Sequence, residues 1–131
     1  MKLRIHKDSL RLQLNRSDVE QFRETGMCEE SLRFGSDSQL ICTLGVSSQL
    51  KVMEAQYRQD CIRILLPIEM AQKWADSDQI SVSLNRVDGS GPTLLIEKDF
   101  QCLHSDERNP SDDADAFPNP LAGDPDRETV R

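Results

Sequence analysis

Apolar and polar residues alternate along several short stretches of the chain, which is the pattern of strands with one buried face. The first two stretches, residues 2–6 and 10–14, flank a turn at residues 7–9 and predict a hairpin. Polar or glycine-containing turns separate the later stretches as well. The remaining predicted strands, in chain order, cover residues 28–34, 40–46, 50–57, 61–66, 80–84 and 93–100.

Two other segments have the spacing of short amphipathic helices. Ser17 is followed three residues later by Glu20, as in a capping box, and Gly26 suits a helix C-terminus, which predicts a helix over residues 17–25. Pro67 is favourable in the first turn of a second helix, because a proline lacks the amide that this turn leaves unpaired. The apolar faces of these helices carry Val19, Phe22, Met70, Ala71 and Trp74.

The order strand, strand, helix, strand, strand occurs twice. A shift of 52 residues places Leu12 on Ile64 and Phe22 on Trp74. Either the chain contains a duplication, or one alternating strand simply matches another. The fold class predicted is α+β, with about eight mainly antiparallel strands and two short helices. A duplicated unit would form a barrel or a strongly curved sheet with a pseudo-two-fold axis, and the pattern does not decide between them.

The composition changes after residue 103, which divides the chain into a domain at residues 1–103 and a tail at residues 104–131. The tail carries eight acidic and three basic residues and four of the six prolines. Such a segment buries too little apolar surface to offset the entropy of ordering, and we expect it to be flexible. One apolar island, residues 117–121, interrupts it. Phe117 and Leu121 are candidates for docking on this protein or on a partner.

The net charge of −7 belongs mostly to this tail, and the predicted domain is nearly neutral. An acidic tail would repel phosphates, so nucleic acid is an unexpected partner. No apolar run approaches the roughly 20 residues of a membrane helix, and the first residues lack the apolar core of a secretory signal. Four scattered cysteines fit thiols in a reducing compartment. We therefore expect a cytoplasmic protein of unknown oligomeric state.

Basic residues share one side of the predicted opening hairpin. Lys2, Arg4 and His6 alternate with apolar residues, and Arg11 is expected across from them. Together with Arg63 they form a candidate site for a phosphorylated or carboxylated small molecule, because guanidinium groups donate to such anions in a planar fork. The alternative is a solvated outer face, which is how one side of most antiparallel sheets looks.

A second cluster lies where the domain meets the tail. Cys102 and His104 would point the same way in an extended chain and, with Asp99 or Glu97, are candidate metal ligands. A nucleophilic thiol with its base and simple local packing are the alternatives. Of the other cysteines, Cys42 is predicted to be buried, Cys61 to share a face with Arg63, and Cys28 to join Leu32 and Phe34 on a core face.

Several short motifs resemble those of a family of short uncharacterised bacterial proteins known by a domain-of-unknown-function label. They are residues 1–5 (MKLRI), 9–12 (SLRL), 73–75 (KWA), 97–103 (EKDFQCL) and 117–120 (FPNP). The resemblance runs from Met1 to about Pro120, and residues 97–103 are its most specific part. It implies a bacterial cytosolic protein and no particular activity, ligand or partner.

The function that requires the fewest assumptions about these features is that of a non-catalytic protein-interaction domain. The alternatives are binding or turnover of an anionic small molecule on the basic face, and metal binding at the segment that contains Cys102 and His104. No cofactor is predicted, and whether any reaction is catalysed stays open.

Overall fold

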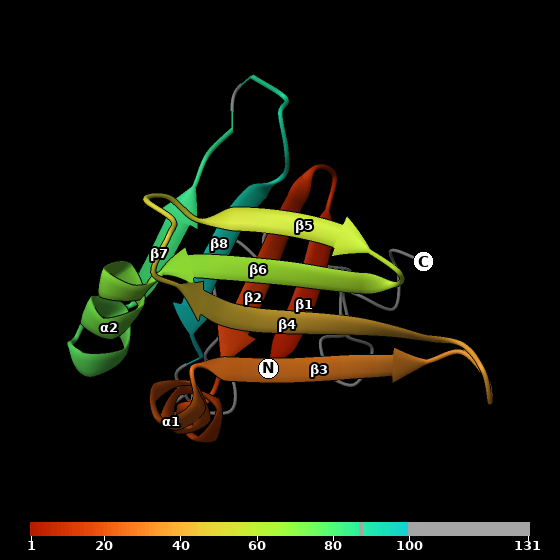
Figure 1. The fold of residues 1–131 in the computed structure, drawn as a ribbon, viewed down its shortest axis with the longest axis horizontal. Coiled ribbons are helices and arrows are strands. Elements are labelled where there is room, and N and C mark those ends of the chain that lie inside the picture. Colours follow the sequence, from red (N-terminus) through yellow and green to blue (C-terminus); the bar gives the residue numbers. More distant parts are fainter. Residues whose placement is uncertain (87, 100–131) are drawn as a thin grey trace, which may run out of the picture. The chain divides into compact units, whose positions relative to one another are not determined.

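Eight strands and two helices make up the described part of the chain, residues 1–86 and 88–99, in the computed structural model (Figure 1). This confirms the α+β class and the number of strands. In chain order the elements are β1 (Lys2–His6), β2 (Ser9–Leu14), α1 (Arg16–Thr25), β3 (Met27–Arg33), β4 (Gln39–Ser47), β5 (Glu54–Arg58), β6 (Cys61–Pro67), α2 (Ile68–Asp76), β7 (Ser81–Leu84) and β8 (Thr93–Lys98).

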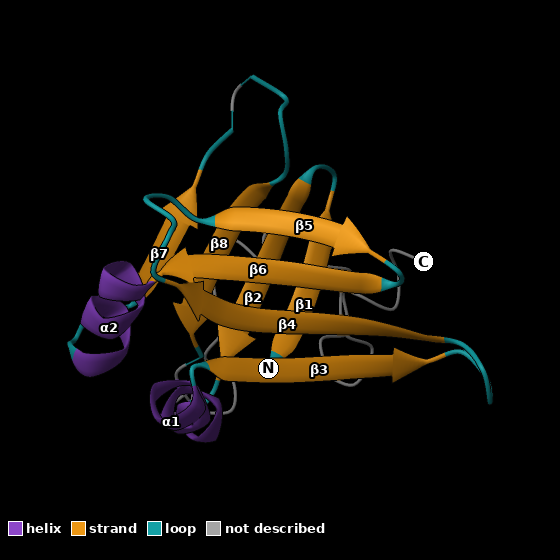
Figure 2. Ribbon diagram, viewed as in Figure 1, coloured by secondary structure: helices purple, strands orange, loops and turns teal. Residues whose placement is uncertain are grey.

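The strands form two four-stranded sheets that lie face to face with crossing strands (Figure 2). The first sheet has the order β1-β2-β8-β7 and the second has the order β3-β4-β6-β5. In each sheet the outer pairs are antiparallel, whereas the central pairs β2–β8 and β4–β6 are parallel. The described residues therefore form neither a closed barrel nor a purely antiparallel sheet. Side-chain alternation reports which face is buried and carries no information on strand direction, which is why the parallel pairs were not foreseen.

The internal repeat is visible in the backbone. Shifting the chain by 52 residues superimposes the bounds of β1 on those of β5. It also relates two turn residues with positive φ, Lys7 at 53° and Gln59 at 52°. The repeat also relates two backbone hydrogen bonds. The amide of Thr93 donates to the carbonyl of Asp8 at 2.9 Å, and the amide of Ile41 donates to the carbonyl of Asp60 at 3.0 Å. The element order predicted for both halves is confirmed.

Each sheet takes one hairpin from each half of the chain. The β1–β2 hairpin of the first half pairs with β8 of the second half, and β3–β4 of the first half pairs with β6 of the second half. A two-stranded hairpin is marginal in water on its own. Neither half therefore contains a complete sheet.

The hydrophobic core lies between the two sheets, and the two helices close one end of it (Figure 1). Phe22 of α1 and Trp74 of α2, which the repeat relates to each other, make an edge-to-face contact with ring centroids 6.0 Å apart. The fully buried aliphatic side chains come from both sheets: Leu12, Leu14, Leu44, Ile64, Leu66, Leu94 and Ile96.

The start of α1 differs from the prediction. The N-cap is Asn15, whose side-chain oxygen accepts from the amide of Asp18 at 2.8 Å, while the Asp18 carboxylate accepts from the amide of Asn15 at 3.1 Å. Ser17 lies inside the helix, so the capping box expected with Glu20 was wrong. Asn15 with Asp18 has the same three-residue spacing as Ser17 with Glu20. Because β2 ends at Leu14, the helix begins directly after it and Asn15 becomes the N-cap. Of the helices in the described residues, neither is long and apolar enough to cross a membrane.

Gly26 ends α1 in the left-handed conformation, with φ at 78°, and its amide donates to the carbonyl of Phe22 at 2.8 Å. A Cβ at this position would lie 3.5 Å from Cγ2 of Val46, so the cost of a side chain is conformational rather than steric. We expect Gly26→Ala to lower the free energy of unfolding by about 1–2 kcal/mol, measured by urea denaturation. Gly35→Ala is the matched control, because Gly35 has no such φ and no atom near its added Cβ. Equal effects of the two substitutions would contradict the prediction.

Candidate functional site

The basic residues of the opening hairpin do share one face. Lys2, Arg4 and His6 of β1 lie opposite Gln13, Arg11 and Ser9 of β2, respectively. Because the intervening Leu10, Leu12 and Leu14 point into the core, this face is the outer side of the first sheet. Arg63, in contrast, lies on the outer side of the second sheet, next to buried Ile64. The structure therefore brings together four of the five proposed ligand residues and separates the fifth.

Carboxylates contact two of these cations. Nε of Arg11 donates to Oε1 of Glu97 at 2.7 Å, and Nε2 of Gln13 donates to the same oxygen at 2.8 Å. The Glu97 side chain is 15% exposed, so this network lies partly inside the sheet surface. Nζ of Lys2 lies 3.3 Å from Oδ2 of Asp99. The outer face of the first sheet thus has mixed charge rather than a uniform basic charge.

The candidate metal ligands Cys102 and His104 lie outside the described residues, as do the proposed docking residues Phe117 and Leu121. Asp99, the third proposed ligand, is described and is paired with Lys2. Within residues 1–86 and 88–99 no group of three or more His, Cys, Asp or Glu side chains is arranged to hold a metal ion.

Two of the described cysteines are buried thiols. Cys28 donates through Sγ to the carbonyl of Asp18 at 3.0 Å, and burial raises the pKa of its thiol. Burial raises the pKa of Cys42 further, to about 11. Because the unfolded thiol ionises near pH 9, the contribution of Cys42 to stability is present below pH 9 and is lost as the pH rises towards 11.

We expect iodoacetamide at pH 8 to modify Cys61, which is partly exposed, and to leave Cys42 intact in the folded protein. At that pH only about one Cys42 thiol in a thousand is ionised, and the thiolate is the reactive form. Peptide mass spectrometry after timed labelling measures this difference. In 8 M urea both cysteines should react at similar rates. Labelling of Cys42 as fast as Cys61 in the folded protein would contradict the assignment.

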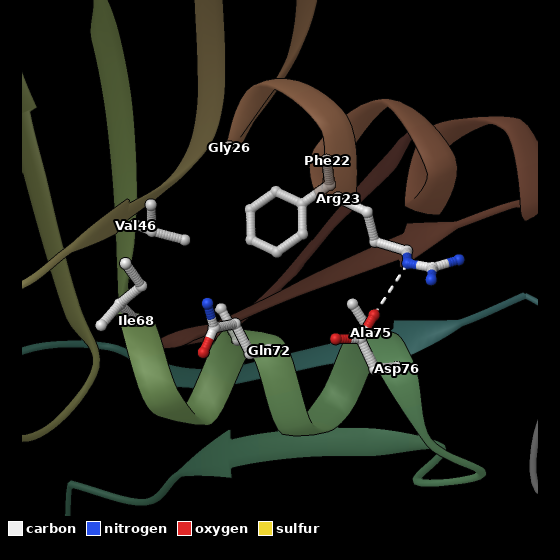
Figure 3. Close-up of a pocket in the computed structure, with 9 residues that line it drawn as sticks. Phe22, Arg23, Gly26, Val46, Ile68, Gln72, Ala75 and Asp76 are labelled. Atoms are coloured by element: carbon white, nitrogen blue, oxygen red, sulfur yellow. Dashed lines mark hydrogen bonds and ion pairs between the residues drawn. The ribbon is translucent and has the colours of Figure 1, made fainter.

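A shallow groove of about 230 Å³ runs between α1 and α2 (Figure 3). Phe22 and Val46 form its apolar floor, and Ala75 lines the side that α2 contributes. At one end Nε of Arg23 donates to Oδ1 of Asp76 at 2.8 Å, which ties the two helices together. The groove holds no further charged pair among the described residues that line it, and its small size fits a contact between helices better than a ligand site.

A second apolar surface lies at the end of β3 and β4 that extends past β1 (Figure 1). The amino nitrogen of Met1 lies 3.1 Å from Oε1 of Glu30, so β1 begins over the middle of β3. Beyond that point β3 continues with Leu32, which is 56% exposed, and Phe34 follows it at 68%. Leu40 is the strand partner of Leu32 and is half-buried.

Tyr57, near the end of β5, is also exposed, but the register places it level with Ile62, Cys42 and Glu30, at the opposite edge of the sheet from Leu32. It pairs with Ile62 on the core side of the second sheet and is nevertheless 64% exposed. We call Leu32, Phe34 and Leu40 the apolar extension. It is continuous with the core side of the second sheet, and within the described residues no strand of the first sheet covers it.

The apolar extension departs from the internal repeat. Leu84, which the 52-residue shift relates to Leu32, packs against the core. The strands of the first half are also longer: β3 and β4 have seven and nine residues, whereas their equivalents β7 and β8 have four and six. The first half thus carries additional strand length, and Leu32 near the end of β3 is exposed where its equivalent Leu84 packs against the core.

Cys28, Leu32 and Phe34 were predicted to join on a core face, but Leu32 and Phe34 are exposed rather than buried. Cys28 is 2% exposed, but the first sheet is too narrow to cover the residues after Glu30. The sequence does carry a signal for this limit of the core, namely the consecutive glutamates Glu29 and Glu30. Because neighbouring residues of a strand point to opposite faces, they place one carboxylate on each face of β3. Alternation alone does not reveal this limit.

The chain belongs to DUF7009, a family of unknown function whose model matches residues 1–121. This confirms the resemblance to a family known by a domain-of-unknown-function label. The matched range extends past the described residues to Leu121 and so includes the island at residues 117–121. Neither a curated protein nor a solved structure matches the chain.

Proposed function

We propose that this member of DUF7009 is a non-catalytic protein-interaction domain, and that the apolar extension is its binding surface. The observation that carries the proposal is the group of large apolar side chains exposed on the core side of the second sheet. Contiguous apolar surface of this kind is costly in water and marks interaction sites in many proteins. The additional strand length in one half of a repeated fold supports the same interpretation.

The partner segment that best fits this surface is an extended peptide with apolar residues at alternate positions. Strand β1 is an edge of the first sheet, and an edge strand offers its outward backbone groups to a further strand. Neighbouring strands lie about 4.8 Å apart, and residues along a strand rise about 3.3 Å each. A strand added beside β1, which begins over Glu30, would therefore lie over Leu32.

The basic face has less support as a binding site for anions. Of its cations, Arg11 donates to Glu97 and Lys2 lies against Asp99, so a ligand anion would compete with two carboxylates. The partly buried Glu97 would also repel a phosphate bound at the centre of the sheet. These contacts favour the interaction domain over the small-molecule alternative.

Site-specific photo-crosslinking in the cells of origin tests the proposal. A photoreactive phenylalanine analogue replaces Leu32 in one variant and Ser31 in the other. These two neighbours point to opposite faces of β3, so the second variant is a matched control. We expect a discrete adduct with one protein from position 32 and none from position 31.

The adduct should also disappear when Ile5→Asp is added, because this side chain lies on the core side of β1 and is 65% exposed. A charge there would disfavour an apolar strand beside it without disturbing the core. Equal adducts from positions 31 and 32, or an adduct that survives Ile5→Asp, would overturn the proposal.

A further inference from the structure

An open groove of about 500 Å³ lies between α2 and β7, an edge strand of the first sheet. Figures 1 and 3 show the helix beside the strand, running in the opposite direction. The volume of the groove lies within the range of about 300–1,000 Å³ that is typical of ligand sites. We call it the α2–β7 groove, and the residues that α2 and β7 contribute to it are Glu69, Met70, Lys73, Ser81, Val82 and Ser83.

The backbone of β7 has unpaired groups along this groove. The amide of Lys98 donates to the carbonyl of Ile80 at 3.0 Å, which makes these residues a bonded pair of the antiparallel β7–β8 ladder. Bonded pairs alternate along such a ladder, so the N–H and C=O groups of Ser81 and Ser83 point away from β8. Within residues 1–86 and 88–99 no backbone group pairs with them.

One of these outward groups already accepts a hydrogen bond from a side-chain amide. Nε2 of Gln79, which also lines the groove, donates to the carbonyl of Ser81 at 3.0 Å. The N–H of a side-chain amide is the same kind of donor as a peptide N–H. The edge of β7 therefore binds the donor that an added strand would offer, and such a strand would displace Gln79.

The internal repeat shows that this edge is less protected than its equivalent. The shift of 52 residues relates Ser81 to Glu29 and Val82 to Glu30 of β3, which is an edge strand of the second sheet. Glu29 is exposed, and the Glu30 carboxylate lies 3.1 Å from the amino nitrogen of Met1. Charged side chains on an edge strand disfavour pairing with another chain, and β7 lacks them.

The charged residues of α2 that line the groove select the direction of a partner strand. Glu69 and Lys73 are exposed and lie one helical turn apart, and neither forms an ion pair among the described residues. Because α2 and β7 run in opposite directions, Lys73 lies towards Ser81 and Glu69 towards Ser83 (Figure 3). A strand antiparallel to β7 would thus begin near Glu69 and end near Lys73.

The faces of β7 select the side chains of that strand. Val82 is buried on the core side, against which α2 also packs. Directly opposed residues of an antiparallel pair have side chains on the same face, so a residue opposite Val82 would point towards α2 and contact Met70. The residues two before and two after it point the same way. A basic side chain at the first of these positions complements Glu69, and an acidic one at the second complements Lys73.

We propose that an extended segment of a partner protein binds in the α2–β7 groove as a fifth strand of the first sheet, antiparallel to β7. Its side chains that face α2 are basic, apolar and acidic, in this order at alternate positions. The short length of β7 limits the added strand to about five residues. Because β7 and β1 are opposite edges of the first sheet, this site is separate from the surface of the proposed function.

An NMR titration of the ¹⁵N-labelled full-length chain with a synthetic peptide tests the proposal. The peptide has blocked ends, arginine, leucine and glutamate at alternate positions in this order, and threonine at the others. We expect saturable shifts of the Ser81 and Ser83 amides and slower hydrogen exchange of the Ser83 amide. A control peptide with arginine and glutamate exchanged should bind at least about threefold more weakly, because both charges then meet a like charge on α2.

Variants of the chain test the backbone pairing. Ser83→Pro removes an outward amide without removing a bond to β8 and should weaken binding at least about fivefold. Ser31→Pro is the matched control, because it lies at the equivalent position of β3, and it should leave binding unchanged. Gln79→Ala should strengthen binding about two- to fivefold, since the Ser81 carbonyl no longer has a competing donor. Gln79→Ala and the exchanged peptide keep the test valid should Ser83→Pro unfold.

Several results would overturn the proposal. They are the absence of saturable shifts at Ser81 and Ser83, equal affinities of the two peptides, and equal affinities of Ser83→Pro and Ser31→Pro. Protection of the Ser83 amide that needs no peptide and rises with protein concentration would assign the groove to a second copy. Shifts at Leu3 and Leu32 instead would place the peptide at the surface of the proposed function and overturn this site alone. Failure of crosslinking from position 32 would overturn only the proposed function.

Discussion

Neither half of the chain should fold alone. Residues 1–52 and residues 53–131, prepared separately, should give far-UV circular dichroism spectra of largely unfolded chains, and an equimolar mixture should recover the spectrum of the intact protein. The reason is that each half supplies one hairpin to each sheet, and the parallel pairs β2–β8 and β4–β6 that join them exist only between halves. Two hairpins that belong to different sheets, with one helix, leave most of their apolar faces in water.

The control is a chain with a protease site inserted in the exposed loop near Lys51, cut after folding. This nicked protein should stay folded, which separates the effect of the missing partner from that of the break itself. A folded monomer of either half, with a cooperative unfolding transition, would contradict the interlocked arrangement.

Trp74→Ala should have the largest effect of any single substitution in the described domain. Trp74 is fully buried, packs edge-to-face against Phe22, and donates through Nε1 to the carbonyl of Ile80 at 2.9 Å. Nζ of Lys98 lies 5.7 Å from its ring centroid. Removing a buried aromatic ring costs about 3–5 kcal/mol, and a domain of this size is typically stable by only about 5–15 kcal/mol. Chemical denaturation followed by far-UV circular dichroism measures the change.

Trp74→Phe separates the two contributions of this side chain. It keeps an aromatic ring against Phe22 but removes the Nε1 donor, while the Ile80 carbonyl still accepts from the amide of Lys98 at 3.0 Å. We therefore expect a smaller loss of about 1–3 kcal/mol, from the lost hydrogen bond and the smaller ring. Gln72→Ala, at an exposed position of the same helix, should change stability by no more than about 0.5 kcal/mol. A loss for Trp74→Ala no larger than that for Gln72→Ala would show that the ring does not anchor the two helices.

The local pattern of apolar and polar residues was sufficient to predict most of the strands and helices. Alternation predicted each strand to within a few residues, and the spacing of Val19, Phe22, Ala71 and Trp74 predicted the buried helix faces. The 52-residue repeat was also visible before the structure, because equivalent elements keep the same order. These features depend on residues close in sequence, whose side chains point to fixed faces of a helix or strand.

The candidate sites were harder to predict. The shared face of Lys2, Arg4, His6 and Arg11 follows from hairpin register, but the contact between Arg11 and Glu97 joins residues that are far apart in the chain. The apolar extension was missed because exposure depends on where the opposing sheet ends.

Alternation and spacing alone therefore define the α+β class, the order of the elements and which face of each is apolar. The tertiary structure decided which strands pair across the two halves, that the central pairs are parallel, and that Leu32 and Phe34 remain uncovered. The physical reason is that the face to which a side chain points is set by its own backbone. Its burial and the direction of the neighbouring strand depend on parts of the chain that are distant in sequence. Arg11 and Glu97, which are hydrogen-bonded, are 86 residues apart.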